Sequence, residues 1–202
     1  KPKEIKTSVE KLRELGYLKD VYGEELKSED QVLELMPHDV VLQSTSVLGP
    51  EAADKVFLNI AGFVNDLLER FYGLGKFYDL KGREDLVGVN VVCMAPHNCA
   101  GVVGRIIGWS SMQGLLASPY MHAAMRRDCD GDEAAVMLLM DVLLNFSKEF
   151  LPSHRGGSQD APLVLNSRIR AGEVDDQILF FETAGSYPWS WYRSAEKGVR
   201  SC

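Results

Sequence analysis

Apolar residues recur at intervals of three and four between residues 50 and 72, with charged residues between them. Because this spacing places the apolar side chains on one face of an α-helix, the segment is predicted to be an amphipathic scaffold helix that ends at Gly73. A shorter helix is predicted to begin at Thr7, with Glu10 completing a capping box, and to end at Gly16.

The pattern changes after residue 80, where apolar residues form continuous runs. The valine-rich runs Leu86–Met94 and Val102–Trp109 are predicted to be strands. Gly104 and Gly108 lie inside the second run, where glycine often marks a bend or a close approach of the backbone. The run Glu133–Phe150 is apolar on nearly all sides and is predicted to be a buried helix. The mixture of strands and helices predicts an α+β fold.

An acidic loop lies between these runs. Asp128, Asp130 and Asp132 occupy alternate positions, with Gly131 between the last two. Like charges so close together repel one another, and a hard divalent cation with oxygen ligands would offset that repulsion. An EF-hand is excluded, because its glycine is sixth and its twelfth residue is a carboxylate, whereas here the glycine is fourth and the twelfth residue is Leu139. A solvated turn remains an alternative interpretation.

Several basic residues near this loop are candidates for binding phosphate. Guanidinium groups bind phosphate bidentately, so Arg126 and Arg127 beside a metal loop indicate phosphoryl or nucleotidyl transfer. His97 and His122 are either site residues or ordinary loop and core histidines. Arg155 precedes two glycines that would let the backbone approach a phosphate or form a mobile turn.

Composition and charge limit the class of protein. The chain has 202 residues, of which 46% are hydrophobic and 25% charged, as in an ordinary globular protein. The net charge of −7 argues against a generic nucleic-acid coat protein, although residues 97–172 hold seven basic and seven acidic residues. Bound metal would neutralise several of those acids and leave a positive face. The chain has no apolar run of the roughly 18 residues that a membrane span requires.

Cysteine usage favours a reduced, cytoplasmic setting. The four cysteines form no CxxC pair and no dense framework. A zinc site built from Cys93, His97 and Cys99 would need unusual spacing. Cys129 lies inside the acidic loop, but thiolates suit softer metals than magnesium, so it is expected to be a small packing residue.

Long stretches of the chain resemble the large catalytic subunit of archaeal family-D DNA polymerases. The resemblance covers most of the chain and fades after about Asp176. The stretches that carry it are Lys1–Ile5, Leu15–Tyr17, Ser28–Gln31, Ala95–His97, Ala100–Gly108, Pro119–Ala124, Arg126–Leu139, Arg155–Gly157 and Asp160–Val164.

This resemblance implies a function and a set of site residues. Asp130 and Asp132 would be the principal ligands of catalytic Mg²⁺, for which Mn²⁺ could substitute. Asp128 would be the third ligand, although the family often has asparagine there. The reaction would be metal-dependent nucleotidyl transfer from dNTPs to a primer 3′-hydroxyl. The residues expected to contact phosphate or DNA are Arg126, Arg127, His122, His97, Arg105 and Arg155.

The resemblance also implies a larger assembly. The family core consists of two double-psi β-barrels, and residues 81–176 would form part of one, with the metal loop and buried helix. Residues 1–80 would be a mainly helical accessory segment and residues 177–202 a divergent, truncated tail. The family's zinc modules and first barrel are missing from these residues, so the fragment alone is expected to be inactive.

The expected partners are primer-template DNA, a small subunit with 3′→5′ exonuclease activity and a sliding clamp, with no membrane. Two other functions remain open at this point. One is a non-catalytic DNA-binding or assembly module with a structural metal loop, and the other is a metal-dependent nuclease.

Overall fold

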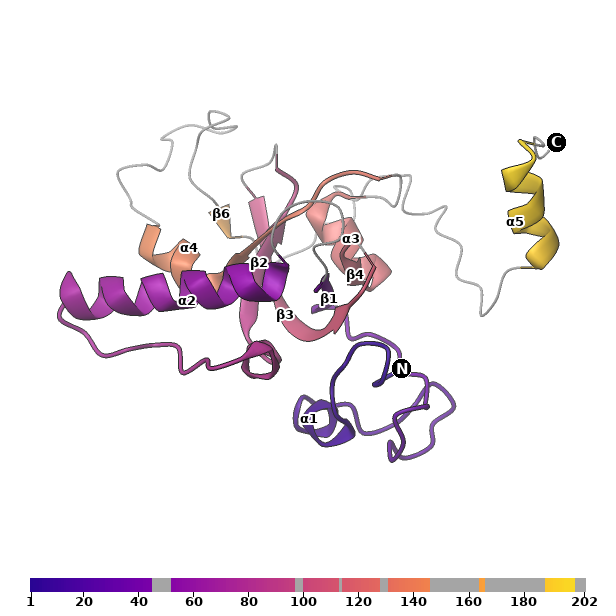
Figure 1. Cartoon of the computed structure of the whole chain (residues 1–202), viewed down its shortest axis with the longest axis horizontal. Helices are drawn as coiled ribbons and strands as arrows, with labels where there is room; N and C mark the ends of the chain where they lie inside the picture. Colours follow the sequence, from indigo (N-terminus) through magenta and orange to yellow (C-terminus); the bar gives the residue numbers. More distant parts are fainter. Residues whose placement is uncertain are drawn as a thin grey trace.

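The structure, a computed structural model, describes residues 1–44, 52–96, 100–112, 114–127, 131–145, 164–165 and 188–198. It confirms the α+β class (Figure 1). The elements in chain order are α1 (Val9–Glu14), β1 (Asp39–Gln43), α2 (Ala53–Arg70), the 3₁₀ helix η1 (Arg83–Leu86), β2 (Asn90–Met94), β3 (Ala100–Ser110), β4 (Leu116–Ala117), α3 (Pro119–Met125), β5 (Ala135–Leu138), α4 (Leu139–Asn145), β6 (Val164–Leu165) and α5 (Trp189–Glu196).

The strands form one sheet with β3 at its centre. Five of them lie in the order β4-β1-β3-β2-β5, and β6 pairs with β3 outside this path. Strand β1 runs parallel to β3, while β2 is antiparallel to both β3 and β5. The described strands therefore form an open sheet, and the double-psi β-barrel stays a prediction.

Helix α2 covers one face of this sheet. Its buried residues Phe57, Ala61, Val64 and Leu68 recur at intervals of three and four and belong to the same core cluster as sheet residues such as Ile106. Full burial of such a side chain contributes about 1.5–3 kcal/mol. The amphipathic helix predicted for residues 50–72 is therefore confirmed.

The N-terminal segment packs against the other face of β1 and β3. Neighbouring strand residues point to opposite faces of a sheet. Val41 and Ile107 therefore lie on the face away from α2, where they form a second apolar cluster with Leu12 of α1. The N-cap of α1 is Ser8, whose hydroxyl accepts the Lys11 N–H at 3.2 Å, so the predicted cap at Thr7 was wrong by one residue. In Figure 1 this segment forms a lobe around α1.

The sheet contains strands from both the predicted N-terminal segment, residues 1–80, and the predicted central segment, residues 81–176. Strand β1 comes from residues 1–80 and pairs with β3 through Asp39–Gln43. The first 80 residues thus contribute a sheet strand as well as α1 and α2, while the predicted boundaries at 80 and 176 remain predictions.

The single buried helix predicted for Glu133–Phe150 is wrong. Its start is strand β5, which pairs with β2 from Val91↔Leu138 to Met94↔Ala135, and helix α4 begins only at Leu139. A continuous apolar run is compatible with either structure, and here the open edge of β2 provides backbone partners for a strand. The acidic loop therefore precedes a strand and not a helix. Among the described helices, none is long and apolar enough to cross a membrane.

Candidate active site

The acidic loop connects α3 to β5, and both of its ends are anchored. Helix α3, which the sequence patterns did not predict, ends at Arg126 in the left-handed region, with φ 58° and ψ 43°. The Arg127 N–H then donates a hydrogen bond of 2.9 Å to the His122 carbonyl in the last turn of α3. Gly131, with φ 102°, makes the second left-handed turn before β5 begins. Asp128, Cys129 and Asp130 lie outside the described residues.

An ion pair joins the two sides of this loop. The Arg127 Nη1 atom lies 2.8 Å from Oδ2 of Asp132, and the side chains are 12% and 44% exposed. The Nε atom of Arg127 also donates to the Arg126 carbonyl at 3.1 Å. The two predicted site residues Arg127 and Asp132 are thus brought together, with Arg127 orienting the carboxylate.

Arg126 differs from its neighbour in its surroundings. Its side chain is exposed, and its left-handed backbone directs the chain out of α3. A positive charge at this position can approach an anionic ligand from solvent, which suits the predicted phosphate contact. The sequence pattern treated the two arginines as equivalent, and the structure distinguishes them.

His122 lies on α3, one turn before the loop. Its Nδ1 atom is buried and has no hydrogen-bond partner among the residues that the structure describes. Burial lowers the pKa of His122, which favours the neutral imidazole. The predicted contact of His122 with phosphate or DNA stays a prediction. His97 and Arg155, the other predicted contacts on loops, lie outside the described residues.

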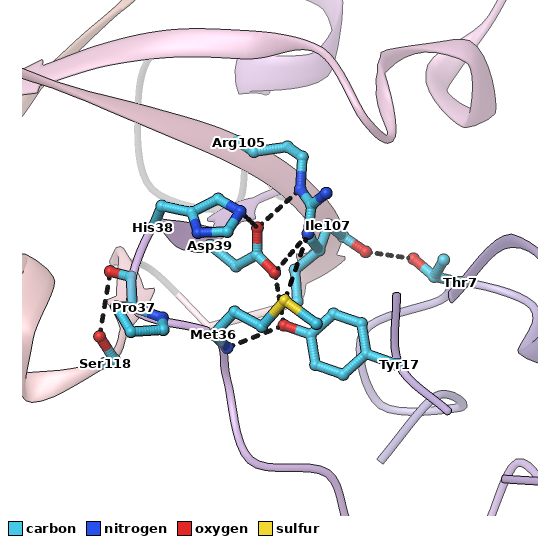
Figure 2. A network of polar contacts seen from close by, with 9 residues as sticks. All are labelled: Thr7, Tyr17, Met36, Pro37, His38, Asp39, Arg105, Ile107 and Ser118. Atoms are coloured by element: carbon cyan, nitrogen blue, oxygen red, sulfur yellow. Dashed lines mark hydrogen bonds and ion pairs between the residues drawn. The ribbon is translucent and has the colours of Figure 1, made fainter. Parts of the chain in front are cut away.

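Arg105 lies in β3, on the partner strand of β1, where it forms a bidentate ion pair with Asp39 (Figure 2). Its Nε is 2.8 Å from Oδ1 and its Nη2 is 2.9 Å from Oδ2, while the Asp39 side chain is fully buried. The hydrogen bond to Asp39 raises the pKa of the Arg105 guanidinium. These contacts favour a structural role, and the predicted contact of Arg105 with phosphate or DNA stays a prediction.

Two more residues complete this polar network and were missed by sequence reasoning. The Tyr17 hydroxyl donates to Oδ2 of Asp39 at 2.5 Å and accepts the Met36 N–H at 3.0 Å. Burial first, and then the bond to Asp39, raise the pKa of Tyr17. His38 Nε2 lies 3.4 Å from Oδ1 of Asp39. The one available signal was a lone aspartate at the start of the apolar run that forms β1.

The part of the loop that the structure describes is compatible with a metal site. Carboxylate oxygens are the ligands that Mg²⁺ prefers, and Asp132 places one carboxylate on the described side of the loop. Within the described ranges, no group of three or more His, Cys, Asp or Glu side chains is close enough to hold a metal. Asp132 is the one member of the predicted triad in those ranges. Cys93 is fully buried, and burial raises its pKa to about 12, so it suits packing better than zinc binding.

Comparison with known proteins identifies the family. A model of the family described as "DNA polymerase II large subunit DP2, catalytic domain" matches residues 1–201. The DNA polymerase II large subunit of Methanothermobacter thermautotrophicus is 52% identical over 191 residues, which is 95% of this chain and 17% of that protein. The large subunit of Pyrococcus furiosus is 50% identical over 194 residues, which is 96% of this chain and 15% of that protein.

A third relative, the DNA polymerase II large subunit of Methanococcus maripaludis, is 48% identical over 199 residues, which is 98% of this chain and 17% of that protein. The chain therefore spans about one sixth of the length of these curated relatives. Its match to the catalytic-domain model extends over the sheet, α3 and both anchors of the acidic loop. The chain belongs to the family of DNA polymerase II large subunits.

Proposed function

We propose that this chain supplies the catalytic carboxylates of a replicative, metal-dependent DNA polymerase. The observation that carries the proposal is the match of a catalytic-domain model to residues 1–201, a stretch that includes the acidic loop. The ion pair between Arg127 and Asp132 supports it, because a carboxylate held in one orientation is suited to binding a cation.

Asp130 and Asp132 would hold Mg²⁺ or Mn²⁺, with Asp128 as the third ligand. When bound, the metal lowers the pKa of a primer 3′-hydroxyl and stabilises the charge on the phosphates. The protein's own contribution is orientation: Arg127 holds Asp132, and exposed Arg126 binds a phosphate of the dNTP or of the DNA backbone. Phosphate contacts of this kind are independent of sequence, as a polymerase requires. His122, His97, Arg105 and Arg155 complete the proposed DNA-facing set.

The proposed partners follow from the family. The chain would act within a full-length large subunit on primer-template DNA, together with a small 3′→5′ exonuclease subunit and a sliding clamp. The two-barrel core, the zinc modules elsewhere in the subunit, the cytoplasmic location and the inactivity of this fragment alone belong to the same proposal.

The test uses the full-length large subunit reconstituted with its small subunit. Asp130→Asn and Asp132→Asn are each compared with wild type in primer extension and in primer-template affinity. The expected result is loss of extension with DNA affinity retained. Asp66→Asn, an exposed aspartate on α2, is the matched control and should extend primers normally.

Three other outcomes would contradict the proposal. Undiminished extension by both loop variants would place the chemistry elsewhere. Loss of thermal stability in proportion to activity would indicate a structural metal loop in a non-catalytic module. Release of nucleotides without incorporation by the wild-type enzyme, in the absence of the small subunit, would indicate a nuclease.

A further inference from the structure

Ser118 makes two hydrogen bonds that connect α3 to the segment before β1. Its hydroxyl oxygen accepts the Met121 N–H at 3.3 Å and thereby caps the helix. The same hydroxyl donates to the Pro37 carbonyl at 3.1 Å, across 81 residues of sequence. Figure 2 shows this second contact next to the ion pair of Asp39 and Arg105. With its side chain buried, Ser118 therefore connects the start of α3 to the start of β1.

Tertiary contacts must determine where α3 lies, because a helix of seven residues is unstable in isolation. Helix α3 also has apolar contacts with the core of the sheet: Met121 and Met125 are both buried there, and Met121 lies over Gly104 of β3. A Cβ atom at Gly104 would lie 2.8 Å from Cε of Met121 and 3.2 Å from the His38 carbonyl. The glycine thus permits the close approach, but a flexible methionine can slide along a strand. Ala117, directly before the helix, pairs with Val40 of β1, and the directional Ser118 hydrogen bond acts with that pairing to set the position of the helix along its axis.

The end of α3 leads directly into the acidic loop. The Arg126 N–H donates to the Ala123 carbonyl, and the Arg127 N–H donates to the His122 carbonyl. The ion pair of Arg127 with Asp132 then continues the connection to the far side of the loop. Each step from Pro37 to Asp132 is therefore a directional contact or a helical turn.

We propose that Ser118 is a positioning residue for the metal loop. Its hydrogen bond to Pro37 holds α3 in the register that places Arg126, Arg127 and Asp132 correctly for nucleotidyl transfer. The inference rests on the proposed function, because it assigns the register of α3 a consequence for the chemical step. Ser118 itself contacts neither substrate nor metal.

The test separates the contact with Pro37 from the helix cap. Glycine is nearly as favourable as serine at an N-cap, so Ser118→Gly keeps most of the capping and removes the contact with Pro37. Ser118→Thr retains a hydroxyl and should restore the wild-type behaviour. Ser8→Gly, which changes the equivalent cap of α1, is the matched control. All are made in the full-length large subunit with its small subunit, and kcat, KM for dNTP, primer-template Kd and Tm are measured.

The expected result for Ser118→Gly is a fall in kcat of about 10- to 100-fold, since small displacements of reacting groups have effects of that size. KM and Kd should stay within about twofold of wild type, as the binding groups remain present. A fall in kcat that is matched by the fall in the folded, DNA-binding fraction would overturn the inference, and so would an unchanged kcat.

Asp130→Asn in the same assay distinguishes failure of the positioning role of Ser118 from failure of the proposed function. If it abolishes extension while Ser118→Gly leaves kcat intact, the positioning role fails and the proposed function stands. If Asp130→Asn leaves extension intact, the proposed function itself fails.

Discussion

Replacing Arg105 with methionine is expected to destabilise the fold, because the change leaves the Asp39 carboxylate buried without its cation. Removing one partner of a buried ion pair costs about 3–5 kcal/mol. Asp39 is fully buried, but Arg105 is 18% exposed and the Tyr17 hydroxyl would remain bonded to the carboxylate. These two facts place the expected loss near the lower limit, at about 3 kcal/mol. For a chain of this size, that loss lowers Tm by about 6–12 °C.

The assay is urea unfolding of the 202-residue chain, followed by circular dichroism, for the single variants Arg105→Met and Asp39→Asn and for their combination. The pair should show a coupling free energy of about 1–3 kcal/mol, because the two side chains contact each other directly. Arg105→Lys is the conservative comparison: it keeps the charge but loses the bidentate fork, so its loss should be intermediate.

The opposite pattern would refute this reasoning. If the free energy of unfolding of Arg105→Met lay within about 0.5 kcal/mol of the wild-type value, the ion pair would not stabilise the sheet. If the same variant in the full-length subunit weakened primer-template binding at unchanged stability, Arg105 would be a phosphate ligand, as the family resemblance implies.

Three further predictions concern packing and titration. Gly108→Ala would place a Cβ 2.5 Å from the Ile5 carbonyl oxygen, so limited proteolysis should release the N-terminal segment faster than in wild type. The control is Gly62→Ala on α2, whose Cβ would meet nothing within 4 Å and which should be cleaved at the wild-type rate. Iodoacetamide at pH 8, followed by peptide mapping, should leave Cys93 unmodified until urea is added, because burial raises its pKa to about 12. Burial lowers the pKa of His122, so as pH falls below about 6.5 the histidine is protonated in the unfolded chain before it is protonated in the folded one. The folded state is therefore expected to lose stability, and the urea midpoint should decrease when the pH is lowered from 7 to 5. The decrease should be smaller in His122→Gln.

Local patterns predicted the elements whose residues determine their own structure. The apolar spacing between residues 50 and 72 identified α2 without knowledge of the sheet, and the valine-rich run identified β3. The spacing did not identify the buried face, because Val56, Phe63 and Phe71 contribute to it and are exposed. The run that begins at Glu133 was different, because its strand form depends on the backbone partners that β2 provides. Local periodicity carries no information about such a partner.

The polar contacts around the site were beyond sequence reasoning for a related reason. Asp39 and Arg105 are separated by 66 residues and meet because β1 pairs with β3 in one parallel register. The contact of Ser118 with Pro37 depends on that register as well. Pairs of this kind can be recognised only once the order of strands is known.

The difference between Arg126 and Arg127 shows how the fold gives unlike roles to like residues. Both follow α3, but the left-handed turn at Arg126 exposes its side chain and lets the next residue turn back toward Asp132. A largely buried guanidinium 2.8 Å from a carboxylate serves orientation, since its charge is already compensated there. An exposed one can be reached from solvent, as the proposed phosphate contact of Arg126 requires. This arrangement fits the proposal that Arg127 orients Asp132 while Arg126 binds phosphate, and the difference between the two arginines follows from one backbone conformation.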